Sequence, residues 1–291
     1  MIKTLNAQQF NGDEISITVA GLKLAGRQWG NPEGRPAIAL HGWLDNCASF
    51  DAMAPQFGNI HLIALDLAGH GFSDFRSPDS SYNIWQDVPE IFSVADQQGW
   101  EQFALIGHSR GAIISAIAAG TLPERISKLV LIDTLGPDTV EPEQAPEQLR
   151  KATLQRLQPL KTRRYYRSSE QAIASRLAGR LALSEQAATQ LATRGLSASE
   201  QGFYWHADPR LKHASDIKLG SDHAKAFLQH VQCPTLLCMG ADGLRKATSQ
   251  FTVPLFPLIK KCEEMVLPGG HHLHMEESAD AVAKAINYFM A

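Results

Sequence analysis

One serine flanked by glycines constrains the fold of this chain more than any other feature. Gly107 and Gly111 stand two residues to either side of Ser109, after the apolar run Phe103–Ile106 and before a helix-favouring stretch of small residues. A strand that turns sharply into a helix strains the backbone at the turn, and bulky neighbours would collide there. The pattern therefore predicts that Ser109 stands at the end of a buried strand with its hydroxyl exposed, as a candidate nucleophile.

Further apolar runs of the buried-strand type alternate with helical patterns along the chain. The runs are Pro36–Leu40, Ile60–Leu65, Lys128–Ile132, Pro234–Gly240 and Cys262–Leu267. Helical patterns include Ile84–Gln98, the stretch after Ser109, Ser221–Gln232 and the C-terminal stretch from about Glu277. Such alternation predicts the α/β class, with a mostly parallel sheet covered by helices on both faces.

Composition excludes several classes of protein. The 291 residues are 44% hydrophobic and 20% charged, as in ordinary globular domains. A net charge of -3 gives no basic footprint for nucleic acid. No apolar run approaches the roughly 18 residues that span a bilayer. We therefore expect neither nucleic acid nor membrane as a partner.

The cysteines and the N-terminus predict a cytoplasmic location. The four cysteines, Cys47, Cys233, Cys238 and Cys262, have neither metal-site nor disulfide spacing, and are interpreted as buried thiols in a reducing cytosol. The N-terminal residues, numbers 1 to 6, lack the apolar core of a signal peptide.

Three motifs in this order resemble the α/β-hydrolase superfamily: His41-Gly42-Trp43, the loop from Asp66 to Ser73, and Gly107-His108-Ser109-Arg110-Gly111. The stretch His-Gly-Trp-Leu-Asp-Asn that begins at His41 is also similar to one in the serine hydrolase-like group. The resemblance covers about residues 15–135 and 215–291. It implies the α/β-hydrolase fold, with a helical cap inserted after the sixth strand, but it does not name a substrate.

The chain between the two matching parts has a different composition. A proline-rich, acidic connector is followed by helical segments rich in Ala, Leu, Gln and Arg. By resemblance we expect a first core part at 1–135, a cap at 136–212 and a second core part at 213–291. Residues 137–212 contain twelve Lys/Arg and eight Asp/Glu. This excess could attract anionic substrates, although solvated helix faces are the simpler interpretation.

A serine hydroxyl needs an adjacent base, usually an imidazole oriented by a carboxylate. The resemblance places the base near the C-terminus, directly after a glycine and five residues before a glutamate. His271 fits, because it follows Gly270 and precedes Glu276 by five. His272 and His274 would then lie behind it or at the surface. A metal site of the three histidines is the alternative, but their spacing is not helical and further ligands are not evident, so no metal or organic cofactor is expected.

The carboxylate has two candidates. Most of the superfamily places it after the seventh strand, three residues past a glycine, where this chain has Gly243 and, one residue early, Asp242. Asp133 directly follows the run Lys128–Ile132, which is the sixth strand when the two strands predicted between residues 14 and 30 are counted, and from which some branches supply the acid. The sequence favours Asp133 and leaves Asp242 open.

An oxyanion hole needs two backbone N–H donors aimed at the developing charge. By resemblance these are the amides of Trp43 and Arg110. Gly42 would let the chain approach the substrate, and His41 is interpreted as a hydrogen-bonded structural residue. His108, beside the nucleophile, is expected to be packed within the fold.

The expected activity is hydrolysis of small esters or thioesters through an acyl-enzyme on Ser109, cleaved by water that His271 activates. A serine at this turn argues against haloalkane dehalogenases and epoxide hydrolases, which by resemblance carry aspartate there. Carbon–carbon bond hydrolases, lyases and cofactor-free haloperoxidases stay open, as does a non-catalytic ligand-binding protein. The expected partner is a small acyl substrate, and the sequence assigns no oligomeric state.

Overall fold

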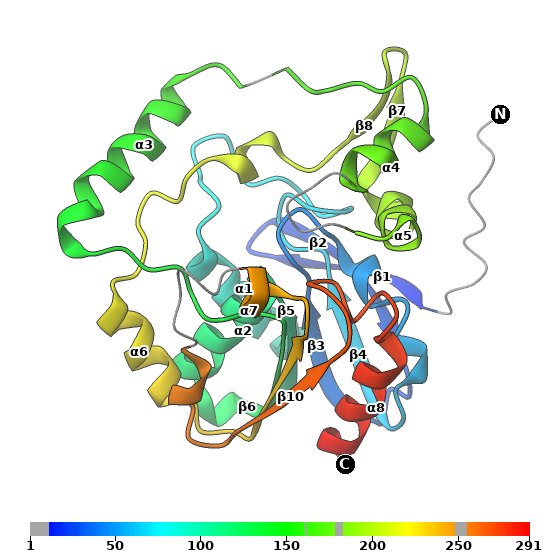
Figure 1. Cartoon of the computed structure of the whole chain (residues 1–291), viewed down its shortest axis with the longest axis vertical. Helices are drawn as coiled ribbons and strands as arrows, with labels where there is room; N and C mark the ends of the chain where they lie inside the picture. The colour runs from blue at the N-terminus through cyan, green and yellow to red at the C-terminus, as the bar shows by residue number, and fades with distance from the viewer. Residues whose placement is uncertain (1–11, 161, 178–182, 248–254) are drawn as a thin grey trace.

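An eight-stranded sheet forms the centre of the computed structural model, which describes residues 12–160, 162–177, 183–247 and 255–291 (Figure 1). The strand order is β1-β2-β4-β3-β5-β6-β9-β10. β2 runs antiparallel to β1 and β4, and the other neighbouring pairs of this sheet are parallel. The strands are β1 (Asp13–Val19), β2 (Leu22–Trp29), β3 (Arg35–Leu40), β4 (Ile60–Leu65), β5 (Phe103–His108), β6 (Ile126–Ile132), β9 (Thr235–Gly240) and β10 (Cys262–Leu267).

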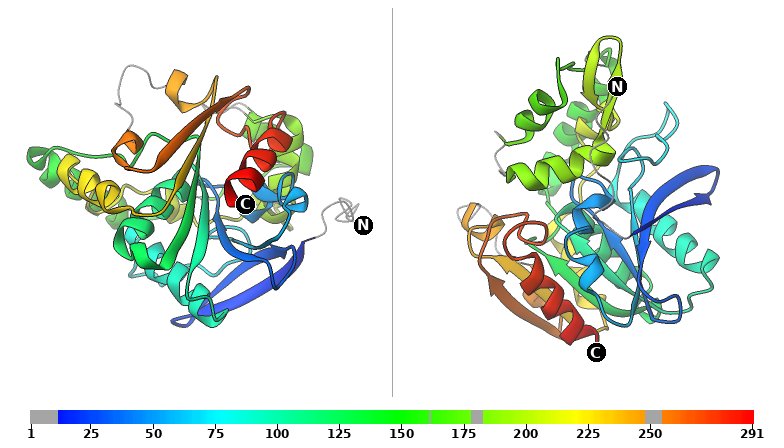
Figure 2. Two further views of the ribbon diagram at one scale, coloured as in Figure 1. Left: turned by 90° about the horizontal axis from the view of Figure 1, so that it is seen from below. Right: turned by 90° about the vertical axis from the view of Figure 1, so that its right-hand side faces the viewer.

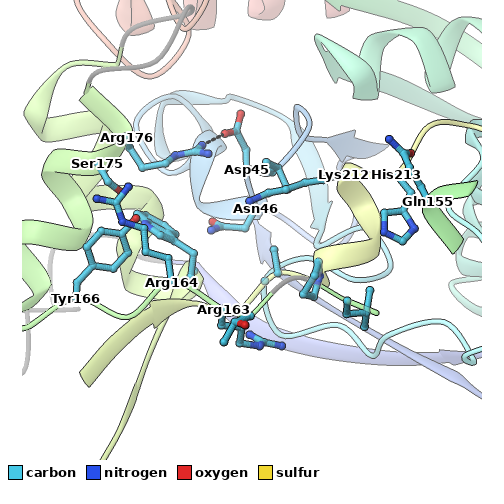
Figure 3. A pocket seen from close by; sticks show the side chains of 18 of the residues that line it. Asp45, Asn46, Gln155, Arg163, Arg164, Tyr166, Ser175, Arg176, Lys212 and His213 are labelled. Carbon is cyan, nitrogen blue, oxygen red and sulfur yellow. Dashed lines mark hydrogen bonds and ion pairs between the residues drawn. The ribbon is translucent and has the colours of Figure 1, made fainter. Parts of the chain in front are cut away.

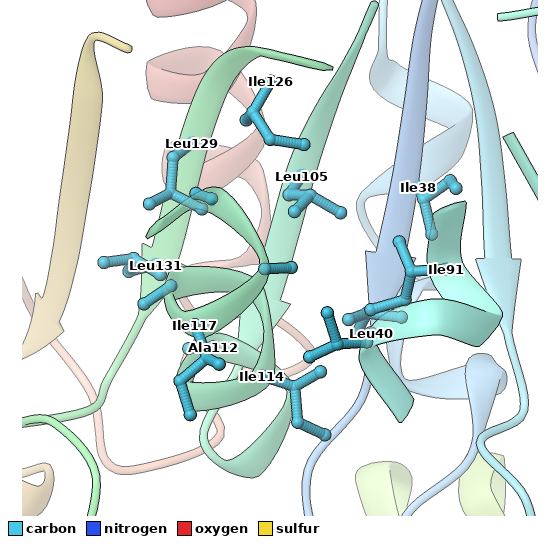
Figure 4. Close-up of a cluster of buried hydrophobic side chains, with 14 of the residues drawn as sticks. Ile38, Leu40, Ile91, Leu105, Ala112, Ile114, Ile117, Ile126, Leu129 and Leu131 are labelled. Atoms are coloured by element: carbon cyan, nitrogen blue, oxygen red, sulfur yellow. The ribbon is translucent and has the colours of Figure 1, made fainter. Parts of the chain in front are cut away.

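The two faces of this sheet bury separate apolar clusters. In β3, Ile38 and Leu40 belong to one cluster, whereas Ala37 and Ala39 belong to the other, because side chains alternate along a strand. Helices α1 (Ile84–Gln97), α2 (Arg110–Thr121) and α6 (Ser221–His230) contribute to the first cluster, part of which Figure 4 shows. Helix α8 (Ala279–Met290) contributes to the second. The predicted mostly parallel sheet with helices on both faces is confirmed.

The chain leaves the sheet after β6 and returns to it at β9. This inserted segment holds the elements α3 (Ala145–Leu157), α4 (Ser169–Leu177), α5 (Glu185–Gly195), β7 (Leu196–Ser199) and β8 (Gly202–Trp205). The last two form a separate antiparallel hairpin. The right-hand view of Figure 2 shows α4, α5 and the hairpin gathered at one end of the molecule, away from α8. The sequence pattern that starts at Ser169 predicts a helix to about residue 182; the structure describes α4 to Leu177, and residues 178–182 lie outside the described part.

One buried arginine ties the inserted segment to the sheet. The Arg194 side chain, at the end of α5, reaches Asp66 at 2.7 Å and Glu14 at 2.5 Å. Burial alone would raise the pKa of Asp66, but the Arg194 guanidinium and two backbone N–H donors outweigh it and lower that pKa. Breaking a buried pair of this kind typically costs about 3–5 kcal/mol, so the end of α5 is held firmly to the core.

All four cysteines are free thiols, of which Cys47, Cys233 and Cys238 are buried and Cys262 is half-buried. Among the described residues, no helix is both long enough and apolar enough to cross a membrane.

Candidate active site

Ser109 occupies the turn between β5 and α2 in a strained backbone conformation, with φ 51° and ψ −117°. Its N–H donates to the carbonyl of Ile132 at 3.0 Å, which fixes the turn against the end of β6. A Cβ at Gly107 would lie 2.5 Å from the Cα of Ala112, and one at Gly111 would lie 2.1 Å from the carbonyl oxygen of Leu40. Glycine is therefore required at both positions, as the sequence pattern predicts.

His271 and Asp133 are in direct contact. His271, in the turn after β10, donates from Nδ1 to Oδ2 of Asp133 at 2.7 Å. Asp133 is completely buried at the end of β6 and also accepts from the backbone N–H groups of Gly240, at 3.0 Å, and Leu244, at 2.8 Å. An ionised carboxylate only accepts, so the proton sits on Nδ1 and leaves Nε2 of His271 as an acceptor.

The alternative acid lies elsewhere. Asp242 is exposed and forms an ion pair with Lys246, one helical turn further along the chain. A Cβ at the neighbouring Gly243 would lie 2.2 Å from Oδ1 of Asp133. Gly243 stands at the position where most of the superfamily has the acid. A side chain there would collide with the carboxylate of Asp133. The structure brings Asp133, and not Asp242, to His271.

Trp43 and Arg110 follow two neighbouring strands. β3 pairs with β5, with Leu40 opposite Gly107, so the loop through Trp43 and the turn at Ser109 begin at the same edge of the sheet. Arg110 is the first residue of α2, and its N–H has no acceptor within that helix. The loop of Trp43 and the first residue of α2 therefore start at the sheet edge where Ser109 stands.

Two histidines brace these loops. His41 donates from Nδ1 to the carbonyl of Gly42 at 2.7 Å and accepts at Nε2 from the N–H of Leu67 at 3.0 Å. His70 accepts at Nε2 from the N–H of Leu44 at 3.2 Å. Burial lowers the pKa of both rings, so both stay neutral. His41 is thus hydrogen-bonded within the fold, in line with its interpretation as a structural residue.

A cluster of four buried histidines was not foreseen from the sequence. The ring centre of His108 lies 4.1 Å from that of His274, 4.7 Å from that of His271 and 5.2 Å from that of His272. The Nε2 of His108 also donates to the carbonyl of His271 at 2.9 Å. His272 and His274 are buried rather than at the surface. Burial lowers the pKa of His274 to about 3 and that of His108 well below its usual value.

Asp45 joins this cluster to the inserted segment. Its carboxylate is 2.7 Å from Arg176 of α4, 3.7 Å from Nε2 of His272 and 3.8 Å from Nδ1 of His108. Burial alone would raise the pKa of Asp45, but His272 and Arg176 bring it well below the usual range. The same carboxylate leaves room only for glycine at position 42, because a Cβ at Gly42 would lie 2.8 Å from its Oδ2. Asp45 stands within the motif that begins at His41, which was the available signal.

Three of these histidines could hold a metal ion. One ring nitrogen from each of His108, His271 and His272 lies within 4.8 Å of the others, and all three rings are buried. Imidazole nitrogens are ordinary ligands of zinc. The set differs from the trio weighed from the sequence, because His108 replaces His274. An ion bound here would occupy the free nitrogen of His271, so metal binding and proton transfer at that ring exclude one another.

Comparisons with known proteins show the family to which the chain belongs. The model of the alpha/beta hydrolase fold family matches residues 36–278. A serine hydrolase-like protein of Dictyostelium discoideum is 30% identical, over 96% of this chain and 82% of its own length. Human serine hydrolase-like protein 2 is 27% identical, over 95% and 93% of the two chains.

Solved structures show the same architecture. The crystal structure of a hypothetical protein from Pseudomonas aeruginosa is 39% identical, with a TM-score of 0.88 over 96% of this chain and 98% of that one. A thioesterase domain from the curacin biosynthetic pathway is 24% identical, with a TM-score of 0.81 over 94% and 99%, and shares the fold. The matching family and the names of these relatives support the interpretation of this chain as a hydrolase. The chain therefore belongs to the α/β-hydrolase family and, within it, to the serine hydrolase-like group.

Proposed function

We propose that this protein is a serine hydrolase that cleaves small esters or thioesters through an acyl-enzyme on Ser109. The observation that carries the proposal is the 2.7 Å contact between Asp133 and Nδ1 of His271. It holds the imidazole in the tautomer whose Nε2 can take a proton from a serine hydroxyl. No metal or organic cofactor is required for this chemistry.

The reaction has two halves. Ser109 Oγ attacks the carbonyl carbon while His271 Nε2 takes the hydroxyl proton, and the same proton passes to the departing alcohol or thiol as the acyl-enzyme forms. A water molecule then gives a proton to His271 and attacks the acyl carbon. The proton returns to Ser109 when the acid leaves. Asp133 stays ionised and stabilises the imidazolium in both halves.

The carbonyl oxygen gains negative charge in each half. We assign the amides of Trp43 and Arg110 to its stabilisation, because their loops start at the same edge of the sheet as Ser109. Loss of one donor of this kind typically costs about 10²–10³ in rate.

Residues 136–212 would act as the cap over this site, between core parts at 1–135 and 213–291. Two contacts support that role. The indole Nε1 of Trp43 donates to the carbonyl of Leu211 at 2.9 Å, and the amide of Asn46 donates to the carbonyl of Leu191 at 2.9 Å. Two parts of the inserted segment, at Leu191 and at Leu211, therefore contact the loop that carries the first proposed oxyanion donor.

A fluorophosphonate probe and p-nitrophenyl acetate test the assignment. Wild type should be labelled and should hydrolyse the ester, whereas Ser109→Ala should not be labelled and should lose at least ~10³ in kcat. Intact-protein mass spectrometry and absorbance at the nitrophenolate band give the two readouts. Ser115→Ala is the matched control, because Ser115 lies on α2 and its hydroxyl bonds the carbonyl of Gly111. Equal labelling of wild type and Ser109→Ala would refute the nucleophile.

A further inference from the structure

A cavity of about 600 Å³ lies between the inserted segment and the loop after Trp43 (Figure 3). Leu44, Asp45 and Asn46 form part of its wall. They directly follow Trp43, whose amide is assigned to the oxyanion hole. The described lining includes neither Ser109 nor His271, so the cavity adjoins the loop that follows Trp43 rather than the nucleophile itself, and it has the size of a small-molecule site.

The described lining of this cavity is strongly cationic. It contains four positively charged side chains and a single carboxylate. The cations are Arg163, Arg164, Arg176 and Lys212, and the carboxylate is that of Asp45. In Figure 3, Arg176 and Lys212 extend from opposite sides toward the loop that carries Asp45 and Asn46.

The one carboxylate is already used. Asp45 is 4% exposed and pairs with Arg176 at 2.7 Å, so it neutralises that guanidinium. In the described part of the chain, Arg163, Arg164 and Lys212 take part in no ion pair with a protein carboxylate. Three positive charges therefore line the cavity without a protein anion to balance them.

Aromatic rings hold all three guanidinium groups of the cavity. The distances to the ring centres are 4.9 Å for Arg163 and Tyr204, 4.9 Å for Arg164 and Tyr166, and 5.3 Å for Arg176 and Trp205. The rings of Tyr166 and Trp205 line the cavity. Stacking on a ring limits the freedom of a guanidinium. The N–H edge of Arg176 binds Asp45, whereas that of Arg164 can bind a carboxylate or phosphate of a ligand.

The wider charge distribution favours the same ligand. Residues 137–212 have a net charge of +4, and the remainder of the chain has −7. Repulsion by the acidic core and attraction by the cationic cavity would steer an anion to the inserted segment, an effect that salt weakens.

We propose that this cavity binds the anionic part of the substrate: an ester or thioester with a carboxylate or phosphate remote from the scissile carbonyl. The inference rests on the proposed function, because it names the substrate class of the same site. The charge can belong to the acyl part or to the leaving group, and both present the same chemistry to the arginines.

Two matched pairs of substrates separate these sources. The first pair is the p-nitrophenyl monoester of adipic acid and p-nitrophenyl hexanoate. Its two members differ in the charge of the acyl part. The second pair is butyryl-coenzyme A and butyryl-N-acetylcysteamine. Its two members differ in the leaving group, which carries phosphates only in coenzyme A. We expect kcat/KM to be at least ~10-fold higher for the anionic member of one pair, and the ratio to fall as ionic strength rises.

Variants of the cavity test the cause of the ratio. Lys212→Glu and Arg164→Gln change exposed side chains, and each should lower the anionic-to-neutral ratio about tenfold, with circular dichroism as the check on folding. Arg150→Gln is the matched control, since Arg150 is an exposed cation of α3 outside the cavity, and its ratio should equal that of wild type. A ratio near one for both pairs, or a ratio that neither variant lowers, would overturn the inference.

Failure of the inference and failure of the proposed function give different results. If Ser109 reacts with the fluorophosphonate and hydrolyses the neutral ester without any preference for charge, the inference is wrong and the proposed function stands. If Ser109 is neither labelled nor active, calorimetry with adipate tests anion binding by the cavity on its own. Weaker binding of adipate to Lys212→Glu than to wild type supports the inference. Equal binding to both, or no binding to wild type, overturns it.

Discussion

Helices α2 and α3 are nearly equal in length but differ in every other respect. Nine residues of α2 are buried, whereas in α3 only Ala152 is. The leucines 149, 154 and 157 of α3 are 43–73% exposed. α2 starts at the candidate nucleophile and shares a buried apolar cluster with the strands of the sheet. α3 belongs to the inserted segment, and Figure 1 shows it at the edge of the molecule, away from the strands. The difference separates a fixed core, which holds the contact between Asp133 and His271, from a more exposed segment that we propose as the cap.

The sharpest test of the fixed part is the carboxylate at the end of β6. We expect Asp133→Asn to fold but to lose about 10³–10⁴ in kcat, because an amide can hold the imidazole in the wrong tautomer. Asp242→Asn, which changes an exposed side chain, should lose less than about twofold. Steady-state kinetics with p-nitrophenyl acetate compare the two. Similar losses in both variants would return Asp242 to consideration.

The next largest effect concerns the contact of α2 with β3. Gly111→Ala would place a methyl group 2.1 Å from a backbone carbonyl, so we expect a loss of about 3 kcal/mol in the free energy of unfolding, or failure to fold. Gly58→Ala is the matched control, because its Cβ would have only one neighbour, at 3.8 Å. Urea unfolding should place Gly58→Ala within about 0.5 kcal/mol of wild type. A Gly111→Ala protein of normal stability would show that the close contact is not required.

A third test uses the buried histidines. The pKa of His274 is about 3 in the fold, against about 6.5 when unfolded. Between these values the unfolded chain binds the extra proton, so stability falls as pH falls. We expect this ring to account for roughly 2 kcal/mol of lost stability between pH 7 and pH 5.

The control for that test is the exposed His223 of α6. His274→Leu should flatten the dependence of unfolding free energy on pH, whereas His223→Leu should not. In wild type, the NMR signal of the His274 ring should keep the shift of a neutral imidazole down to about pH 4. A signal that titrates near pH 6.5 would contradict the buried, neutral state.

The smallest effect is expected on α3. Leu157 is 73% exposed, so Leu157→Ala should change the free energy of unfolding by no more than about 0.5 kcal/mol. Ile114→Ala, on the buried face of α2, should cost about 2–5 kcal/mol. A Leu157→Ala loss comparable to that of Ile114→Ala would mean that α3 is packed in solution and would remove the contrast between the helices.

The sequence predicted the parts of the molecule whose signal is local. The runs that became β3 to β6 and the turn at Ser109 depend on neighbouring residues. The same holds for α5: Ser184 before a helical pattern that stops at Gly195 predicts an N-cap, and its hydroxyl accepts from the N–H of Ala187. The hairpin of β7 and β8 was missed, because Leu-Ser-Ala-Ser has little strand character. The preference for Asp133 over Asp242 came from strand ends, and the structure brings Asp133 to His271.

What the sequence could not give is contact between distant residues. Arg194 and Asp66 are 128 positions apart, and Asp45 and Arg176 are 131 apart. Asp45 and Asp66 lie in recognised motifs, but their partners Arg176 and Arg194 have the pattern of ordinary helix residues. No periodic pattern links the two members of a buried ion pair across such a separation. The four-histidine cluster was missed for the same reason. His108 contacts the other three rings only because the fold brings the end of β5 next to the turn after β10.

The space shared by Asp133 and Gly243 also limits how such a site can change over time. A side chain at position 243 would start where the Asp133 carboxylate now lies, so the two positions cannot both carry an acid in this backbone. Moving the acid from the end of one strand to the end of the other thus requires two substitutions. A side chain at position 243 alone would collide with the Asp133 carboxylate. Loss of the carboxylate at position 133 alone would leave His271 without its acceptor. The two arrangements are separated by a barrier in sequence space that one backbone contact creates.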